Sequence, residues 1–301
     1  MFYEVYTPKV LKTIAERSKS DPSLRALDSR LHPHNEYLAY DRVHLDKCLV
    51  FSKQHDALDQ DRLSRLRQPQ NFHTWQSIYN ELLVPYFFAK VFKLQIDFVT
   101  NPKRKGLGDF QVIHPEERVI VEVKTPEGDD PNLQGPDDTV HEGFDDDLLR
   151  PVFLDGARQL RRGNKNLIVI CTQLCAWIHN SDPFEKLFYG QEVITAPFDP
   201  DVGGLVGPID TKFVPNGELL RHRPKRYTRI SAIASFRNDI SLCRRFSEEA
   251  QQIQFTVFHN YHAVSQIEPN MFAGVEQFIP DTGKGRIEHI NKDKSDFLIE
   301  V

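Results

Sequence analysis

The stretch GLGDFQVIHPEERVIVEVKTP, residues 106–126, reads as two short apolar strands joined by a turn at HPEE. Pro115 supports this interpretation, because proline suits the first central position of a turn. Three charged residues, Asp109, Glu122 and Lys124, interrupt the strands at positions where apolar residues would be expected. Two acids and a lysine inside a sheet indicate a reason other than packing.

The register of this hairpin follows from its turn. If Ile113 pairs with Arg118, then Asp109 lies directly opposite Glu122, and opposed residues share a face with Cβ atoms about 4.5–5.5 Å apart. Lys124 lies two residues beyond Glu122 and points the same way. The other face of the second strand carries three valines that we expect to pack into the core: Val119, Val121 and Val123. The charged face is therefore predicted to be directed to the surface.

Two facing carboxylates repel one another unless a cation lies between them. Divalent ions such as Mg²⁺ prefer one or two carboxylates together with waters and phosphate oxygens. A lysine beside such an ion could stabilise a deprotonated attacking water, or the charge that builds on a phosphate. The pattern predicts a metal and phosphate site at the edge of a sheet; the alternative is a solvated strand face on which these residues fall by chance.

Composition bounds the class of protein. The chain has 301 residues, of which 40% are hydrophobic and 11% aromatic, enough for a sizeable core. It contains no apolar run that approaches a membrane span, and its N-terminus lacks the pattern of a secretory signal. Four scattered cysteines do not form a disulfide framework. We therefore expect a soluble, cytoplasmic protein.

The net charge of −5 is unevenly distributed. Residues 127–147 hold nine acids and no Lys or Arg, so the rest of the chain carries a net charge of +4. Basic clusters at 103–105, 158–165 and 221–229 can meet phosphates, although a solvated surface explains each one individually.

Periodicity predicts a helical N-terminal extension over residues 1–70 and an α/β core over 71–301. A helix capped by Thr74 is expected to run to about Val91, with Pro85 bending or splitting it. LHPHNEY, residues 31–37, reads as a loop, and the tail from about 265 is weakly patterned. The remaining core elements are expected as strands over 95–100, 166–172, 229–236 and 253–260, and as helices over 145–162 and 239–252. Strands alternating with helices favour a sheet covered on both sides.

In these residues the chain resembles the PD-(D/E)XK, or restriction-endonuclease-like, superfamily. Gly108-Asp109 is similar to the first half of its motif, although the literal Pro-Asp is absent, and Glu122-Val123-Lys124 is similar to the second half. The resemblance covers about a third of the chain. It implies a three-layer α/β/α sandwich with a central mixed sheet. It also implies a nuclease dependent on Mg²⁺ or Mn²⁺, in which Asp109 and Glu122 bind the metal and Lys124 assists the water.

The resemblance implies further site residues. A preceding helix often supplies another acid to the metal, and Glu81 is the candidate. The helix after the motif lysine often carries Gln or Arg facing the site, which points to phosphate contacts from Arg158, Gln159 and Arg162. The implied partner is nucleic acid, with DNA expected first and RNA left open, and no membrane. Many family members pair as homodimers, although no stretch here marks a dimer interface.

A different class of function stays open. The same fold could be a catalytically inactive module that binds nucleic acid or a protein partner, and the acidic segment 127–147 favours this alternative. A metal-dependent hydrolase of smaller substrates is a third possibility. Cys171, Cys175 and His179 do not have a zinc spacing, and Asp155 is expected to form a salt bridge.

Overall fold

The computed structural model describes most of the chain. It covers residues 1–32, 36–99, 106–114, 117–127, 144–172, 182–200, 203–205, 207, 210–220, 227–238, 250–281, 286–292 and 294–300. Several predicted features lie outside these residues: the tip of the hairpin turn, most of the acidic segment, Cys175 with His179, and most of the helix expected over 239–252.

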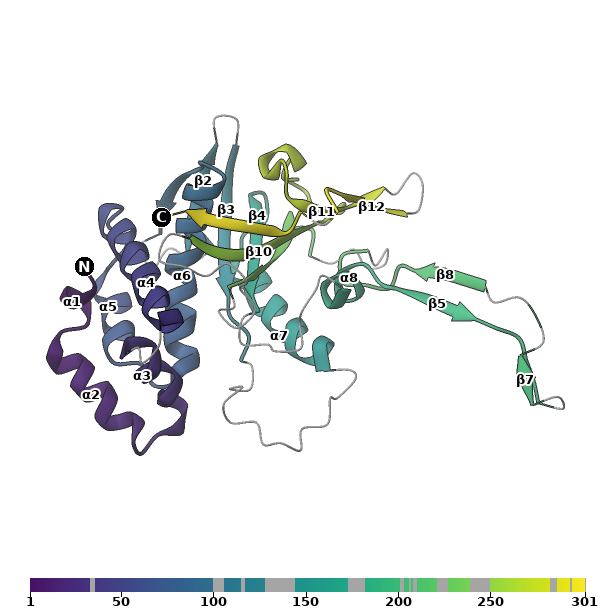
Figure 1. Ribbon diagram of the computed structural model, residues 1–301. Helices are drawn as coiled ribbons and strands as arrows, with labels where there is room; N and C mark the ends of the chain where they lie inside the picture. Colours follow the sequence, from purple (N-terminus) through teal and green to yellow (C-terminus); the bar gives the residue numbers. More distant parts are fainter. Residues whose placement is uncertain are drawn as a thin grey trace.

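A nine-stranded mixed sheet forms the centre of the molecule (Figure 1). Eight strands follow one another in the order β1-β2-β3-β4-β9-β10-β11-β12, and β13 pairs with β10. Their bounds are β1 Gln95–Phe98, β2 Phe110–His114, β3 Glu117–Lys124, β4 Lys165–Cys171, β9 Ala232–Arg237, β10 Ala250–His259, β11 Glu276–Asp281, β12 Arg286–Ile290 and β13 Asp296–Glu300. The two predicted hairpin strands are therefore present. So are the strands predicted over 166–172, 229–236 and 253–260, with small shifts at their ends.

The pairing of the strands is both parallel and antiparallel. The hairpin strands β2 and β3 are antiparallel, whereas β3 pairs with β4, and β4 with β9, in parallel. β10 is antiparallel to β9 along one edge. Its other edge is shared between β13, which is antiparallel, and β11, which is parallel. The motif strand β3 thus lies inside the sheet, with a neighbour on each side.

Helices from the N-terminal part of the chain pack with one face of the sheet. They are α1 Phe2–Val5, α2 Pro8–Ser18, α3 Arg25–Leu31, α4 Glu36–Gln54, α5 Gln60–Arg67 and α6 Phe72–Val91, with a 3-10 turn at Pro22–Leu24. Their apolar side chains form one continuous cluster with β1–β4, β9 and β10. The predicted N-terminal extension therefore shares its core with the sheet.

The long helix α6 differs in detail from the prediction. Asn71 caps it, because its side-chain oxygen accepts a hydrogen bond of 2.8 Å from the backbone N–H of Thr74. Pro85 lies inside the helix without splitting it. After Pro85 the helix continues to Val91, where the prediction placed its end.

The opposite face of the sheet packs against α7 (Phe144–Gln159) and α8 (Asp182–Phe188). Along β4, Leu167 and Val169 belong to the cluster of the N-terminal helices, whereas Ile168 and Ile170 belong to the cluster of α7 and α8. This alternation shows that the sheet is covered on both faces. The predicted α/β class is confirmed.

The N-terminal helices were predicted only as a region, and the tail was predicted as weakly patterned. α4 lies inside the predicted helical region, and only its first two residues fall in the stretch that was read as loop; buried polar residues such as His44 and Ser52 interrupt its apolar pattern. β11, β12 and β13 lie in the tail that the sequence left weakly patterned. In addition, β5 (Gln191–Thr195) and β8 (Asp210–Val214) form a two-stranded ribbon that extends away from the main sheet (Figure 1). Two further short strands, β6 Phe198–Asp199 and β7 Gly204–Leu205, pair with each other.

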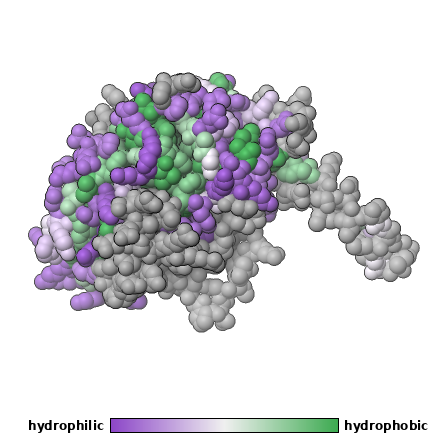
Figure 2. All heavy atoms as spheres, turned by 45° about the horizontal axis from the view of Figure 1, so that its top comes forward, coloured by the Kyte–Doolittle hydropathy of each residue, from purple (hydrophilic) through white to green (hydrophobic). Residues whose placement is uncertain are grey.

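On the face shown in Figure 2, hydrophobic and hydrophilic residues of the described part lie side by side. Among the described residues, four large apolar side chains are exposed: Tyr3, Val50, Tyr261 and Val264. Exposed apolar side chains in such small number are normal for a folded protein and indicate no particular site.

Candidate active site at the β2–β3 hairpin

The hairpin has the register that its turn predicts. Ile113 pairs with Arg118, and Phe110 pairs with Val121. Asp109 directly precedes β2, and its backbone N–H donates a hydrogen bond of 2.8 Å to the carbonyl of Val121, which is already the partner of Phe110, so this contact is offset by one residue from the ladder. The ladder between β2 and β3 ends at the pair of Phe110 and Val121, and the direct opposition of Asp109 and Glu122 stays a prediction.

Gly108 allows the chain to reach this position. Its φ of +63° lies in the left-handed region, which favours glycine. A Cβ atom at this position would lie 2.3 Å from the carbonyl oxygen of Val121. Any other residue would therefore force the backbone of Gly108 away from β3, and Asp109 with it.

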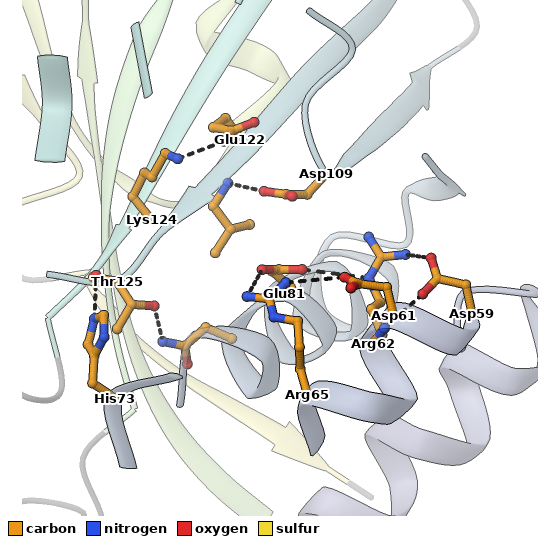
Figure 3. A network of polar contacts seen from close by, with 12 residues as sticks. Asp59, Asp61, Arg62, Arg65, His73, Glu81, Asp109, Glu122, Lys124 and Thr125 are labelled. Atoms are coloured by element: carbon orange, nitrogen blue, oxygen red, sulfur yellow. Dashed lines mark hydrogen bonds and ion pairs between the residues drawn. The ribbon is translucent and has the colours of Figure 1, made fainter. Parts of the chain in front are cut away.

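The side chain of Asp109 is held in place by the neighbouring strand. Its Oδ2 accepts a hydrogen bond of 2.7 Å from the backbone N–H of Val123 (Figure 3). Its backbone carbonyl accepts another, of 3.0 Å, from the N–H of Val99. The carboxylate is thus fixed at the end of β2, between β1 and β3.

Glu122 and Lys124 lie side by side on the face of β3 that α7 covers. The Lys124 Nζ lies 3.0 Å from Glu122 Oε1 and 2.7 Å from Asp155 Oδ2. Gly156 brings α7 close, since a Cβ there would lie 3.4 Å from the Lys124 Cγ. The expectation that all three motif side chains are directed to the surface is wrong for Glu122, whose side chain is only 5% exposed. The reason is that α7 packs over this face of the sheet.

Glu81 lies on α6 and faces two arginines of α5. Its Oε2 lies 3.6 Å from Arg62 Nε, and its Oε1 lies 3.5 Å from an Arg65 terminal nitrogen. Glu122, Asp109 and Glu81 follow one another in Figure 3, with Lys124 beside Glu122 and the arginines beside Glu81. The site is therefore a row of three acids with cations at both ends.

This crowding of acids changes their titration. Burial, and then the charge of Asp109, raise the pKa of Glu122 to about 8 and that of Glu81 to about 7. Burial also raises the pKa of Asp109. For Lys124, burial opposes protonation, but the charge of Glu122 and the hydrogen bond to Asp155 outweigh it and raise the pKa. Without a metal, Glu122 and Glu81 therefore retain protons at pH values where a glutamate is normally ionised, because burial and mutual repulsion disfavour several negative charges here, while Lys124 stays protonated.

A divalent cation would offset this repulsion. In the described part of the chain, no three His, Cys, Asp or Glu side chains are close enough together to hold a metal ion. Asp109 and Glu122 nevertheless suit Mg²⁺ or Mn²⁺, since Mg²⁺ is usually bound through one or two carboxylates, with waters and phosphate oxygens as the other ligands. Glu81 is engaged with arginines, and its role as a third ligand remains a prediction.

Helix α7 brings one of its three predicted phosphate contacts toward the site. Gln159 donates a hydrogen bond of 2.9 Å from Nε2 to Asp155 Oδ2, and Asp155 in turn contacts Lys124. Arg158 is exposed on the same helix, and its charge helps to lower the pKa of Asp155 after the larger effect of Lys124. Arg162 is exposed beyond the end of α7, and the described contacts do not connect it to Lys124.

Polar contacts also tie α6 to the end of the motif strand. The side chain of Asn80 donates a hydrogen bond of 2.8 Å to the Thr125 hydroxyl, and His73 Nε2 lies 3.0 Å from the Thr125 carbonyl oxygen. Thr125 directly follows Lys124, and Asn80 directly precedes Glu81. These contacts hold the helix that carries Glu81 against the strand that carries Glu122.

Sequence reasoning did not assign a role at this site to Asp155, Arg62 or Arg65. The salt bridge expected for Asp155 is present, but its partner is the motif lysine. A signal existed in each case: Asp155 and Gln159 are four residues apart, and Arg62 and Arg65 are three apart, so each pair shares one face of a helix. Which residues these helix faces contact depends on how distant segments of the chain pack together.

Comparison with known proteins adds no assignment. No protein-family model, no curated protein and no solved structure matches this chain. In the part of the chain that the structure describes, no helix is long and apolar enough to cross a membrane.

Proposed function

We propose that this protein is a metal-dependent nuclease that hydrolyses phosphodiester bonds in DNA, or in RNA, on a restriction-endonuclease-like core. One observation carries the proposal. The Lys124 ammonium group lies 3.0 Å from Glu122, and Asp109 is fixed at the adjoining end of β2. The order of α6, the strands β1–β3, α7 and β4 also agrees with the resemblance of the sequence to the PD-(D/E)XK superfamily.

Each residue of the site has a separate proposed role. Asp109 and Glu122 would hold a Mg²⁺ or Mn²⁺ ion, which when bound supplies Lewis acidity and a more acidic water. Lys124 stays protonated, because its pKa is raised. It therefore stabilises negative charge on the attacking oxygen or on the phosphate and does not act as a general base. Asp155 orients the ammonium group, and Gln159 orients Asp155.

The direct test is a cleavage assay. The protein is incubated with supercoiled, linear and single-stranded DNA and with RNA, in Mg²⁺ or in EDTA. We expect cleavage only with the metal, and its loss in Lys124→Ala. Lys165→Ala is a matched control, since Lys165 pairs with Glu117 of β3 near the other end of that strand. Equal cleavage by Lys124→Ala and the wild type would contradict the assignment.

The second candidate is an inactive module that binds nucleic acid or a protein partner. The observation that favours it is the pairing of Lys124 with Asp155 and of Glu81 with Arg62 and Arg65, which occupies charged groups in ion pairs. Binding of nucleic acid without cleavage under all metal conditions would select this alternative. Size-exclusion chromatography of the protein, with and without nucleic acid, would show from its apparent mass whether it is a homodimer.

A further inference from the structure

Two arginines of the N-terminal helical region reach the acidic row from outside the core motif. Arg62 and Arg65 lie on α5, three residues apart on one helical face, and both contact Glu81 of α6. Glu81 is in turn close enough to Asp109 that the charge of Asp109 raises its pKa. The α5 arginines therefore stand at the end of the row that lies opposite Lys124 (Figure 3).

The hydrogen-bonding capacity of these arginines is not used up by the described residues. Arg62 donates to the Ala57 carbonyl and lies 3.4 Å from Asp59. Its Nε is buried and faces Glu81 Oε2 at 3.6 Å, which is too long for a hydrogen bond. The Arg62 side chain is 7% exposed, so it adds buried positive charge behind Arg65 and Glu81 without meeting the solvent itself.

Arg65 is held more loosely. It lies 3.5 Å from Glu81 and 3.8 Å from Asp61, both longer than the about 2.7–2.9 Å of a charge-assisted hydrogen bond. Its side chain is 37% exposed, and that of Asp61 is 73% exposed, so solvent weakens their pairing. A guanidinium group offers five donors in a planar fork that fits phosphate oxygens. Arg65 can therefore bind an anion without leaving Glu81.

We propose that Arg65, supported by the buried Arg62, is a phosphate-binding site for the nucleic-acid strand. This inference rests on the proposed function and extends it: the substrate is contacted by Lys124 at one end of the acidic row and by α5 at the other. The N-terminal helices then form part of the nucleic-acid-binding surface. The positive charge of Arg65 would attract a phosphate that the acidic row by itself would repel.

The test measures binding without cleavage. Labelled single-stranded and duplex oligonucleotides of DNA and RNA are titrated with the full-length protein in Ca²⁺, and fluorescence anisotropy gives Kd between about 50 and 200 mM salt. We expect Arg65→Ala to bind about tenfold more weakly. The slope of log Kd against log salt should fall by about 0.9 for duplex or about 0.7 for a single strand.

Three further variants sharpen the result. Lys12→Ala removes the same charge from α2, where Lys12 is exposed and pairs with Glu16, and should leave Kd unchanged. Asp61→Ala removes a competing anion and should tighten binding. Arg65→Lys keeps the charge but loses the fork, and should lie between Arg65→Ala and the wild type. Thermal unfolding of each variant checks the fold, and Asp61→Ala and Arg65→Lys decide the matter if Arg65→Ala unfolds.

The outcomes separate this inference from the proposed function. If Arg65→Ala binds as Lys12→Ala does, or if the wild type binds no nucleic acid, the phosphate site is wrong. If the wild type cleaves in Mg²⁺ while Arg65→Ala binds normally, only the further inference fails. If Arg65→Ala weakens binding but the wild type never cleaves, the phosphate site stands and the nuclease activity fails.

Discussion

Glu122 on β3 and Glu276 on β11 are both buried glutamates on strands of one sheet, yet their surroundings differ. Each oxygen of Glu276 has a partner: the Thr256 hydroxyl donates a hydrogen bond of 2.8 Å to Oε2, and His289 Nε2 lies 2.7 Å from Oε1. Glu122 has Lys124 at one oxygen and the charges of two other acids nearby. The first arrangement stabilises a fold, whereas the second stores repulsion that a bound cation can relieve.

The largest expected difference between the two glutamates is catalytic. Glu122→Gln removes a proposed metal ligand and the anion beside Lys124, and we expect cleavage to fall by about 10²–10³-fold or more. Glu276→Gln keeps one acceptor oxygen and replaces the other by an NH2 donor, whose hydrogen bond the Thr256 hydroxyl or the neutral His289 ring can accept, and it should cleave as the wild type does. Rates of plasmid cleavage in Mg²⁺ measure both. Equal loss in the two variants would mean that Glu122 is also only structural.

The second difference concerns stability at raised pH. The ordinary pKa of Glu122 and Glu81 is 4.5, and in the folded protein it is raised to about 8 and about 7. Between these values the folded state binds more protons than the unfolded state, so the free energy of unfolding falls as pH rises from about 4.5 to about 8. The expected loss is on the order of a few kcal/mol.

Denaturant unfolding in EDTA at a series of pH values measures this loss. Glu122→Gln cannot ionise at this position and should flatten the decline, because the amide stays neutral. Glu276→Gln should keep the decline of the wild type. A wild-type stability that rises over this range would contradict the crowded arrangement of acids.

Metal binding is the third way to separate the two glutamates. Mg²⁺ or Mn²⁺ at about 100 times its Kd should stabilise the folded wild type by about 2.7 kcal/mol, provided that it does not bind the unfolded chain. Asp109→Asn and Glu122→Gln should lose this increase in melting temperature, and Glu276→Gln should retain it. Stabilisation that survives in all three variants would place the metal elsewhere.

The smallest expected effect concerns the positioning of Lys124. Asp155 is 57% exposed, so Asp155→Ala should change stability by no more than about 1 kcal/mol. Cleavage should fall by about tenfold, because Lys124 loses its orienting partner and keeps only Glu122. The pH profile of kcat distinguishes positioning from a purely structural role, since the loss of Asp155 lowers the pKa of Lys124 and moves the alkaline limb to lower pH. An unchanged profile would count against positioning.

Local patterns in the sequence were enough for the hairpin and its neighbours. The pairing of Ile113 with Arg118 followed from a turn and from alternation, which are properties of adjacent residues. The strands of the tail were missed because β11 carries the buried Gln277, whose amide satisfies the carbonyls of Phe272 and Pro269. One of its partners, β10, pairs with it in parallel, and a parallel pairing leaves no hairpin signal.

The amino-acid sequence by itself determined that Asp109, Glu122 and Lys124 share one end of a β-ribbon, because side-chain alternation and turn length are local. Only the tertiary structure decided that α7 buries Glu122, that Asp155 holds Lys124, and that the α5 arginines reach Glu81. Burial and long-range ion pairs arise where separate segments pack together. No short stretch of the chain contains that information, since each helix specifies which residues share its face but not what that face will meet.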